Sequence, residues 1–196
     1  MIKSLQRNTT YKSMSFNEAS LLASASDSDL PSFTAANLRS LSGWPSHKVG
    51  NAVSSMVRKG ILVRLARGRY SVADDIEDSA FAVATSVAAP AYVSFWSALA
   101  FHGLTEQQPS AIQLVSTRQS RPFNVGGRAV EVARFKPSRF FGYDASGMAT
   151  VEKALLDSLC MPSKAGGFDE VVRCFGAARG KVSVAALARA ASAFGD

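Results

Sequence analysis

Three segments in the first sixty residues place apolar side chains at the spacing of an amphipathic helix. In the first, Leu21 and Leu22 are expected to face inward, and the helix is predicted to end near Ala25. Ser15 or Asn17 can serve as its N-cap, because either side chain can accept a hydrogen bond from a free backbone amide. The pattern predicts a short helix with one inward face.

A second short helix is predicted to begin at Ser32 or Thr34 and to carry Leu38 and Leu41 on one face. Glycine readily adopts the left-handed backbone conformation that ends many helices, so we expect this helix to stop at Gly43.

The third helix is predicted over residues 45–59. Pro45 would occupy its first position, where the fixed φ of proline suits a helix, and Gly60 would end it. The expected inward face repeats at i, i+4 and i+7 or i+8 and consists of Val49, Val53, Met56 and Val57.

A β-hairpin is predicted over residues 61–72, with Gly68 at an arginine-rich tip between two apolar strands. The order helix, helix, turn, helix, hairpin is that of a winged helix-turn-helix domain. We assign residues 1–72 to this domain.

Beyond it, residues 73–80 form an acidic linker, and residues 81–196 show the pattern of a mixed α/β domain, so the predicted fold class is α+β. A strand is predicted over 111–116 and a hairpin over 123–132. Two capped helices and a Gly/Ala-rich helical tail are also expected. The first helix has Ser94 as N-cap, Leu99 inside and Gly103 at its end; the second has Thr150 as N-cap, Val151, Leu155 and Leu159 along one side, and Pro162 after its end.

Charge divides the chain in the same place. The net charge is +7, and residues 1–72 hold ten Lys and Arg against three acids, whereas residues 73–196 hold twelve of each. No Asp or Glu occurs from Leu30 to Ala73. Such asymmetry indicates a polyanionic partner for the N-terminal domain, although charge alone would equally suit a surface that aids solubility.

No segment has the length and hydrophobicity of a membrane span, and residues 1–7 lack the apolar core of a signal peptide, so a cytoplasmic protein is expected. Cys160 and Cys174 lack the nearby ligands of a metal site and are expected to be buried, reduced thiols. We expect no metal and no cofactor.

Double-stranded DNA is the polyanion that the third helix suits best. With its apolar side buried, the outward face would carry short hydrogen-bonding groups and cations, suited to base edges and phosphates in the major groove. Gly50 on the same side would let a partner approach the backbone. The expected DNA-binding residues of this helix are Ser46, His47, Lys48, Asn51, Ser55 and Arg58.

The hairpin adds three arginines to this surface. Strand alternation places Arg67 and Arg69 on the solvent side, and Arg64 flanks the tip. These side chains could reach phosphates or the minor groove, or could merely aid solubility.

Several blocks resemble a known family. The wing Leu-Val-Arg-Leu-Ala-Arg-Gly-Arg-Tyr is followed by Val-Ser-Phe-Trp-Ser-Ala-Leu-Ala-Phe-His-Gly-Leu-Thr-Glu-Gln at 93–107, Ile-Gln-Leu-Val-Ser-Thr at 112–117, Val-Glu-Lys-Ala-Leu-Leu-Asp at 151–157 and Pro-Ser-Lys-Ala-Gly-Gly-Phe at 162–168. From about residue 15 to 190 the chain is similar to the AbiEi-like antitoxins of type IV (abortive-infection) toxin–antitoxin systems.

The resemblance implies a repressor that binds inverted repeats in its own promoter, as a monomer or a dimer. It also implies a C-terminal domain that counters a nucleotidyltransferase-like toxin. The antitoxin role would fall on blocks 94–105 and 151–157, which could equally be core and capping signatures. A regulator without a toxin fits the same sequence.

Two other classes of function stay open. The winged helix could be a docking platform for another protein. An enzyme would need Ser94 or Ser97 to act with His102 and Asp157, but no catalytic motif supports this, and no catalytic residue is assigned. His102 is expected to bond the last carbonyls of its own helix or to interact with the helix dipole. Glu152, Lys153 and Asp157 are expected to form surface or interdomain ion pairs.

Overall fold

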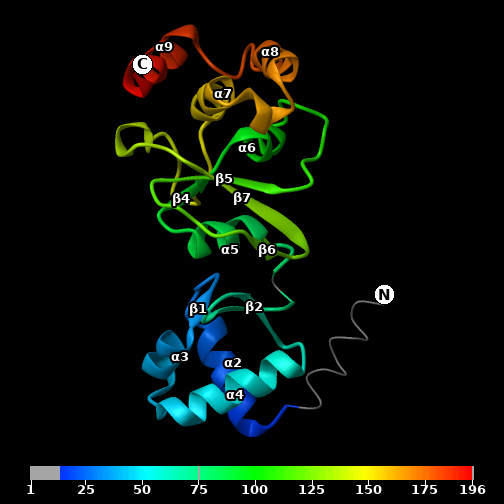
Figure 1. Cartoon of the computed structure of the whole chain (residues 1–196), viewed down its shortest axis with the longest axis vertical. Helices are drawn as coiled ribbons and strands as arrows, with labels where there is room; N and C mark the ends of the chain where they lie inside the picture. Colours follow the sequence, from blue (N-terminus) through cyan, green and yellow to red (C-terminus); the bar gives the residue numbers. More distant parts are fainter. Residues whose placement is uncertain (1–13, 75, 196) are drawn as a thin grey trace. The chain divides into compact units, whose positions relative to one another are not determined.

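The computed structural model describes residues 14–74 and 76–195 and has an α+β fold (Figure 1). The chain divides into two compact units, unit 1 up to Val83 and unit 2 from Ala84. The division falls within helix α5 (Ala80–Val87), close to the end of the expected acidic linker. Asp75 of that linker lies outside the described residues.

Three helices of unit 1 follow the predicted order. The first has Ser15 as N-cap, with Glu18 completing a capping box, and the second has Thr34 as N-cap. Gly43 has φ 68° and ends the second helix as predicted. Leu41 was expected inside but is 45% exposed. The helices are α2 (Phe16–Ser26), α3 (Ala35–Ser42) and α4 (Ser46–Arg58).

The hairpin of unit 1 belongs to a three-stranded antiparallel sheet of order β1-β3-β2. The sequence pattern predicted strands β2 (Leu62–Ala66) and β3 (Arg69–Val72) but missed β1 (Phe33–Thr34). Strand β1 is only two residues long, too short to show an alternating pattern, and it pairs with β3. β3 is therefore a central strand.

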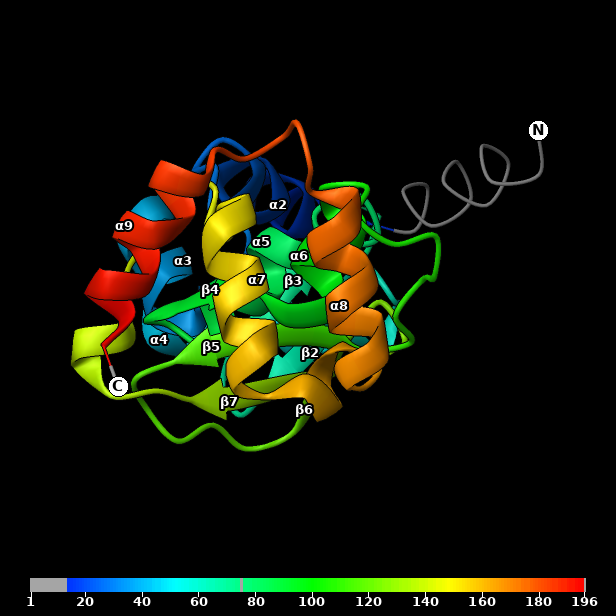
Figure 2. The ribbon, with the colours of Figure 1, turned by 90° about the horizontal axis from the view of Figure 1, so that it is seen from above.

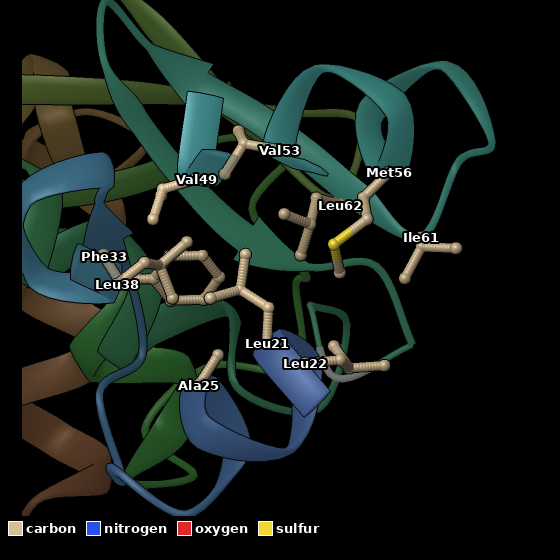
Figure 3. Packing of buried hydrophobic residues seen from close by; sticks show 10 residues of the cluster. All are labelled: Leu21, Leu22, Ala25, Phe33, Leu38, Val49, Val53, Met56, Ile61 and Leu62. Carbon is tan, nitrogen blue, oxygen red and sulfur yellow. The ribbon is translucent and has the colours of Figure 1, made fainter. Parts of the chain in front are cut away.

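The core of unit 1 gathers apolar side chains from its helices and from the sheet (Figure 3). In Figure 3, Leu21 of α2 and Leu38 of α3 lie against Phe33, with Val49 and Val53 of α4 beside them. Burying each large aliphatic or aromatic side chain contributes about 1.5–3 kcal/mol. This burial fixes which side of α4 faces outward.

Unit 2 is built on a four-stranded sheet of order β4-β5-β7-β6. The central strands β5 and β7 are parallel, and the outer pairs are antiparallel. All five residues of β5 are buried, including the polar Gln113 and Ser116, as expected for a central strand with parallel pairing. The predicted strand and hairpin are confirmed; the strands are β4 (Ala91–Val93), β5 (Ile112–Ser116), β6 (Phe123–Val125) and β7 (Arg128–Arg134).

Helices cover this sheet, with α7 beside α9 and α8 (Figure 2). Ser94 and Thr150 occupy the predicted N-cap positions, but only the Thr150 side chain accepts a cap hydrogen bond. Leu99 is fully buried, as predicted. Leu159 was expected inside but is exposed, because the buried side of its helix includes Lys153 and Asp157. The helices are α6 (Phe95–Phe101), α7 (Val151–Cys160), α8 (Phe168–Ala177) and α9 (Val184–Phe194), with short 3-10 turns η1 (Pro137–Arg139) and η2 (Pro162–Ala165).

Within residues 14–74 and 76–195, no helix has both the length and the apolar character needed to span a bilayer.

Candidate nucleic-acid interface

A tight turn joins α3 to α4 and sets where α4 begins. Gly43 takes the left-handed conformation, and Pro45 is the N-cap of α4 rather than its first helical residue. Ser46 is the first helical residue and accepts a hydrogen bond from Nη1 of Arg39 at 3.1 Å. Arg39 was not among the predicted site residues. It is exposed on α3 and reaches the start of α4, so it adds a cation to this end of the helix.

The outward face of α4 lies opposite its buried residues Val49, Val53 and Met56. Exposed positions recur at i, i+4, i+7 and i+11, so they form one stripe along the helix. Ser54 belongs to this stripe and was missed, although the helical period that identified its neighbours also selects position 54. The stripe consists of His47, Asn51, Ser54 and Arg58.

Lys48 and Ser55 lie beside the stripe and are half-buried. The ammonium of Lys48 is 3.8 Å from the centroid of the Trp44 ring, a cation–π contact that restricts this long side chain. A hollow of about 310 Å³ opens here between the start of α2 and α4. It is lined by Ser15, Asn17, Glu18, Trp44, His47, Lys48, Asn51, Ala52 and Ser55.

Glu18 is the acidic residue among those that line this hollow, and its charge is paired with that of Lys59. Its side chain is buried, and its Oε2 accepts hydrogen bonds of 2.7 Å from Nζ of Lys59 and from the backbone amide of Ser15. Burial alone would raise the pKa of Glu18, but these bonds and one from Ser55 outweigh it and hold the pKa at about 2. The contact also ties the start of α2 to Lys59, the residue after α4, so it helps to fix the orientation of α4.

Replacing Glu18 with glutamine is expected to lower the free energy of unfolding by about 1–2 kcal/mol at pH 7, because a charge-assisted hydrogen bond to Lys59 is lost. The pKa is lower in the folded chain than its ordinary 4.5, so the stabilisation is complete above pH 4.5 and disappears as the pH falls toward 2. Urea unfolding at several pH values checks this. Wild type and Glu18→Gln should converge near pH 2; a difference that does not change with pH would contradict the assignment.

The three arginines of the hairpin differ in their exposure to solvent. Arg67 and Gly68 form the turn, and Arg67 is exposed. Arg64 is also exposed, with its Nε 3.5 Å from the carbonyl of Ala66. Arg69 departs from the predicted alternation: it is half-buried, and its Nη1 donates to Oγ of Ser32 at 3.3 Å.

The position of Arg69 has a structural cause. The register of β2 against β3 shifts between Arg64 and Ala66, and Arg69 pairs with Thr34 of the unpredicted strand β1. Ser32, just before β1, is thereby brought within reach of Arg69.

Gly50 lies in the middle of α4, where a Cβ added to its backbone would meet no atom within 4 Å. The chain's own packing therefore does not require glycine at this position. Glycine inside a helix costs about 0.5–1 kcal/mol relative to alanine. Gly50 therefore reduces the stability of α4, and no packing contact within the chain requires it.

The residues that could form an active site in unit 2 do not converge. Oγ of Ser94 donates to Oδ2 of Asp157 at 2.6 Å, but both side chains are fully buried. The ring of His102 bonds the carbonyl of Ala149 at 2.7 Å instead of the end of its own helix, and Ser97 donates to Ala111. The described contacts thus do not assemble a Ser–His–Asp triad.

Asp157 was expected to form a surface or interdomain ion pair. Instead it is buried beside Lys153, one helical turn away, and the two form an ion pair inside unit 2. The hydroxyl of Tyr92 also donates to Asp157, at 3.0 Å. The Lys-x-x-x-Asp spacing would permit such a pair, but nothing in the sequence distinguishes it from an exposed one.

The cysteine prediction is confirmed for one residue only. Cys174 is buried and Cys160 is exposed, and both are free thiols. Within the described part of the chain, no group of three or more His, Cys, Asp or Glu could hold a metal ion. Three of the ten N-terminal basic residues, Lys3, Arg7 and Lys12, lie outside the described residues.

Neither the protein-family models nor the curated proteins give a match to the chain. A solved structure, the crystal structure of the RV2827C protein from Mycobacterium tuberculosis, is similar in fold, with a TM-score of 0.57 and 18% sequence identity. The similarity covers 88% of this chain and 69% of the other. At this identity it supports the α+β fold alone.

Proposed function

We propose that this chain is a transcription regulator that binds double-stranded DNA in a sequence-specific way. In this proposal unit 1 is a winged helix-turn-helix, with α4 as its reading helix and the β2–β3 hairpin as its wing. The observation that carries it is the exposed stripe of α4, which holds hydrogen-bonding and cationic side chains and no acid. A major groove about 12 Å wide admits one such helix.

The side chains of α4 suit two kinds of contact. Asn51 lies mid-helix and exposed, and an asparagine amide can bind the N6 and N7 edge of adenine through two hydrogen bonds. Arg58, Arg39 and Lys48 are suited to phosphates, which position the protein without reading sequence. In this proposal Asn51 and His47 specify the site and the cations hold the backbone.

We further propose that the regulator is an autorepressing antitoxin, a role that rests on the resemblance of residues 93–107 and 151–157 to the AbiEi-like family. Its partners would be promoter inverted repeats and a nucleotidyltransferase-like toxin. Co-expression with the product of the adjacent gene tests this. We expect that product alone to arrest growth and this chain to relieve the arrest. If no neighbouring gene is toxic, the antitoxin role is rejected, whereas the proposed DNA-binding role is unaffected.

Substituting Arg67 with alanine is expected to weaken binding to all DNA sequences alike, because its exposed guanidinium would contact phosphate. The slope of log K against log salt should fall in magnitude by about 0.9 for one lost phosphate contact. Arg69→Ala should have a smaller effect, since Arg69 is bound to Ser32. Electrophoretic shifts on the upstream promoter at several salt concentrations measure both slopes.

Arg179→Ala, an exposed arginine of unit 2, serves as the matched control for net charge. Unchanged affinity for DNA in both the Arg67 and Arg69 variants would show that the β2–β3 hairpin does not contact DNA as a wing. Binding that is insensitive to salt, or a protein partner covering α4, would favour the docking platform instead.

Replacing Gly50 with alanine is expected to change stability and DNA binding in opposite directions. Alanine should raise the free energy of unfolding by about 0.5–1 kcal/mol, because it suits a helix better and meets no neighbour. If DNA approaches the backbone here, the added methyl group should lower affinity. Thermal unfolding and operator binding of the same variant measure both effects, and unaltered affinity would place DNA away from this part of α4.

A further inference from the structure

The last helix of unit 2 is joined to the rest of the unit by few side chains. Among the residues of α9, Phe194 is buried, whereas Val184 at the other end is 85% exposed. The half-buried positions between them, against α7, are Ala186, Leu187 and Ala190. Of these only Leu187 is a large apolar side chain, so the apolar contact of α9 with the rest of the unit depends chiefly on Leu187 and on the buried Phe194 at its end.

One arginine holds that end. The guanidinium carbon of Arg139 lies 4.6 Å from the centroid of the Phe194 ring. Its Nε donates to the carbonyl of Phe194 and its Nη2 to the carbonyl of Gly195, both at 3.2 Å. The ring also meets Phe135 edge-on, with centroids 6.0 Å apart. Arg139 therefore contacts both the ring and two consecutive carbonyls, and its loss would free the end of the helix.

The Phe194 ring covers a buried charge. Nζ of Lys153 lies 4.5 Å from its centroid, and the Lys153 side chain is 1% exposed. The ammonium pairs with Asp157, which also accepts hydrogen bonds from Tyr92 and Ser94. The rings of Phe135 and Phe141 lie 5.3 and 5.0 Å from the ammonium. Phe194 differs from the other rings because it belongs to the weakly held helix.

The segment before α9 is fixed separately. Nζ of Lys181 donates to the carbonyls of His102 and Gly103 at 2.8 and 3.1 Å, at the end of α6. Ser183 is the N-cap of α9. Movement of α9 alone would therefore pivot between Lys181 and Ser183.

We infer that α9 is a latch that opens as a unit about residues 182–183, and that Phe194 is its seal over the Lys153–Asp157 pair. Regions with few buried contacts open at a lower free energy than the global unfolding reaction. Opening would admit water to a charge pair that is otherwise enclosed and would expose the side of α7 that α9 covers. The second unit would thus have two states, which any ligand that prefers one of them would bias.

Amine acylation of the full-length chain, followed by peptide mass spectrometry, tests the latch. Lys153 of the wild type should react slowly, while the more accessible Lys164 reacts at the same rate in all variants. Phe194→Ala should raise the Lys153 rate by about tenfold or more, the change expected when opening becomes easier by about 1.4 kcal/mol. Arg139→Gln should also raise it, because the end of α9 that carries the ring loses the contacts of Arg139 with the carbonyls of Phe194 and Gly195. Val184→Ala, on the same helix but exposed, should leave it unchanged.

Cys174 distinguishes local opening from global unfolding, because its buried thiol lies on α8. In Phe194→Ala it should stay protected from a thiol reagent while Lys153 reacts. Continued protection of Lys153 in that variant would show that the body of the unit, rather than α9, encloses the charge. Equal rises at Lys153 and Cys174 would show that α9 does not open by itself. Either result overturns the latch.

Discussion

Replacing Asp157 with alanine is expected to destabilise unit 2 by about 3–5 kcal/mol, because it leaves the ammonium of Lys153 buried without its partner. Desolvation by burial lowers the pKa of Lys153 and raises that of Asp157, whereas their mutual attraction opposes both shifts. Removing the carboxylate therefore removes the attraction and leaves the desolvation. It also leaves the hydroxyls of Tyr92 and Ser94 without their shared acceptor.

The two tryptophans make this measurement specific to one unit, because Trp44 lies in unit 1 and Trp96 in unit 2. In a Trp44→Phe background, urea unfolding followed by tryptophan fluorescence reports unit 2 alone. Lys164→Ala is the matched control, since its pair with Glu131 is exposed and should contribute at most about 1 kcal/mol.

The double variant Lys153→Met, Asp157→Leu removes both charges together. It should recover much of the loss, because no lone buried charge remains. If Asp157→Ala costs no more than Lys164→Ala, the pair is not buried in solution as described.

The second large effect concerns DNA recognition. Asn51→Ala is expected to weaken binding to the cognate operator by about 1–3 kcal/mol, or roughly 5–150-fold, if its amide makes a two-bond contact with one base. Affinity for unrelated DNA should change little, because that binding depends on phosphate contacts. The specificity ratio therefore falls, whereas Arg67→Ala should preserve it.

In vitro selection of bound sequences first supplies the operator, and fluorescence anisotropy at one fixed salt concentration then compares operator with random DNA. Asn124 is an exposed asparagine of β6, and Asn124→Ala is the control for the loss of an exposed asparagine away from α4. Equal losses on operator and random DNA would show that Asn51 contacts the backbone. No loss of affinity for either operator or random DNA would show that α4 does not read the DNA sequence through Asn51.

Elements with a strong local signal were predicted from the sequence. Thr150 caps the helix that it was expected to cap, Ser15 and Thr34 are each one of the two residues proposed as caps for their helices, and Gly43 ends α3. Val49, Val53 and Met56 are buried together because the helical period leaves one inward side. The outward stripe of α4 follows from the same period, so most of the candidate site was predicted as well.

What the sequence missed depends on contacts between distant segments. The short strand β1 has no pattern of its own, yet its pairing with β3 brings Ser32 to Arg69 and turns that arginine away from solvent. Likewise, Lys153 and Asp157 rather than Leu159 are buried because of contacts with Tyr92, Ser94 and Phe194, which come from two other parts of the chain. A charged side chain can be buried inside a protein only when such partners offset the free-energy cost of removing it from water.

The amino-acid sequence by itself thus determined most of the helices and caps, the hairpin and the basic, acid-free character of residues 30–73, because each depends on neighbours within a few turns of chain. Only the tertiary structure decided which charges are buried, which arginines of the hairpin are exposed and how Phe194 covers Lys153. Those outcomes depend on desolvation and on hydrogen-bond partners, which are set when segments far apart in the chain come together.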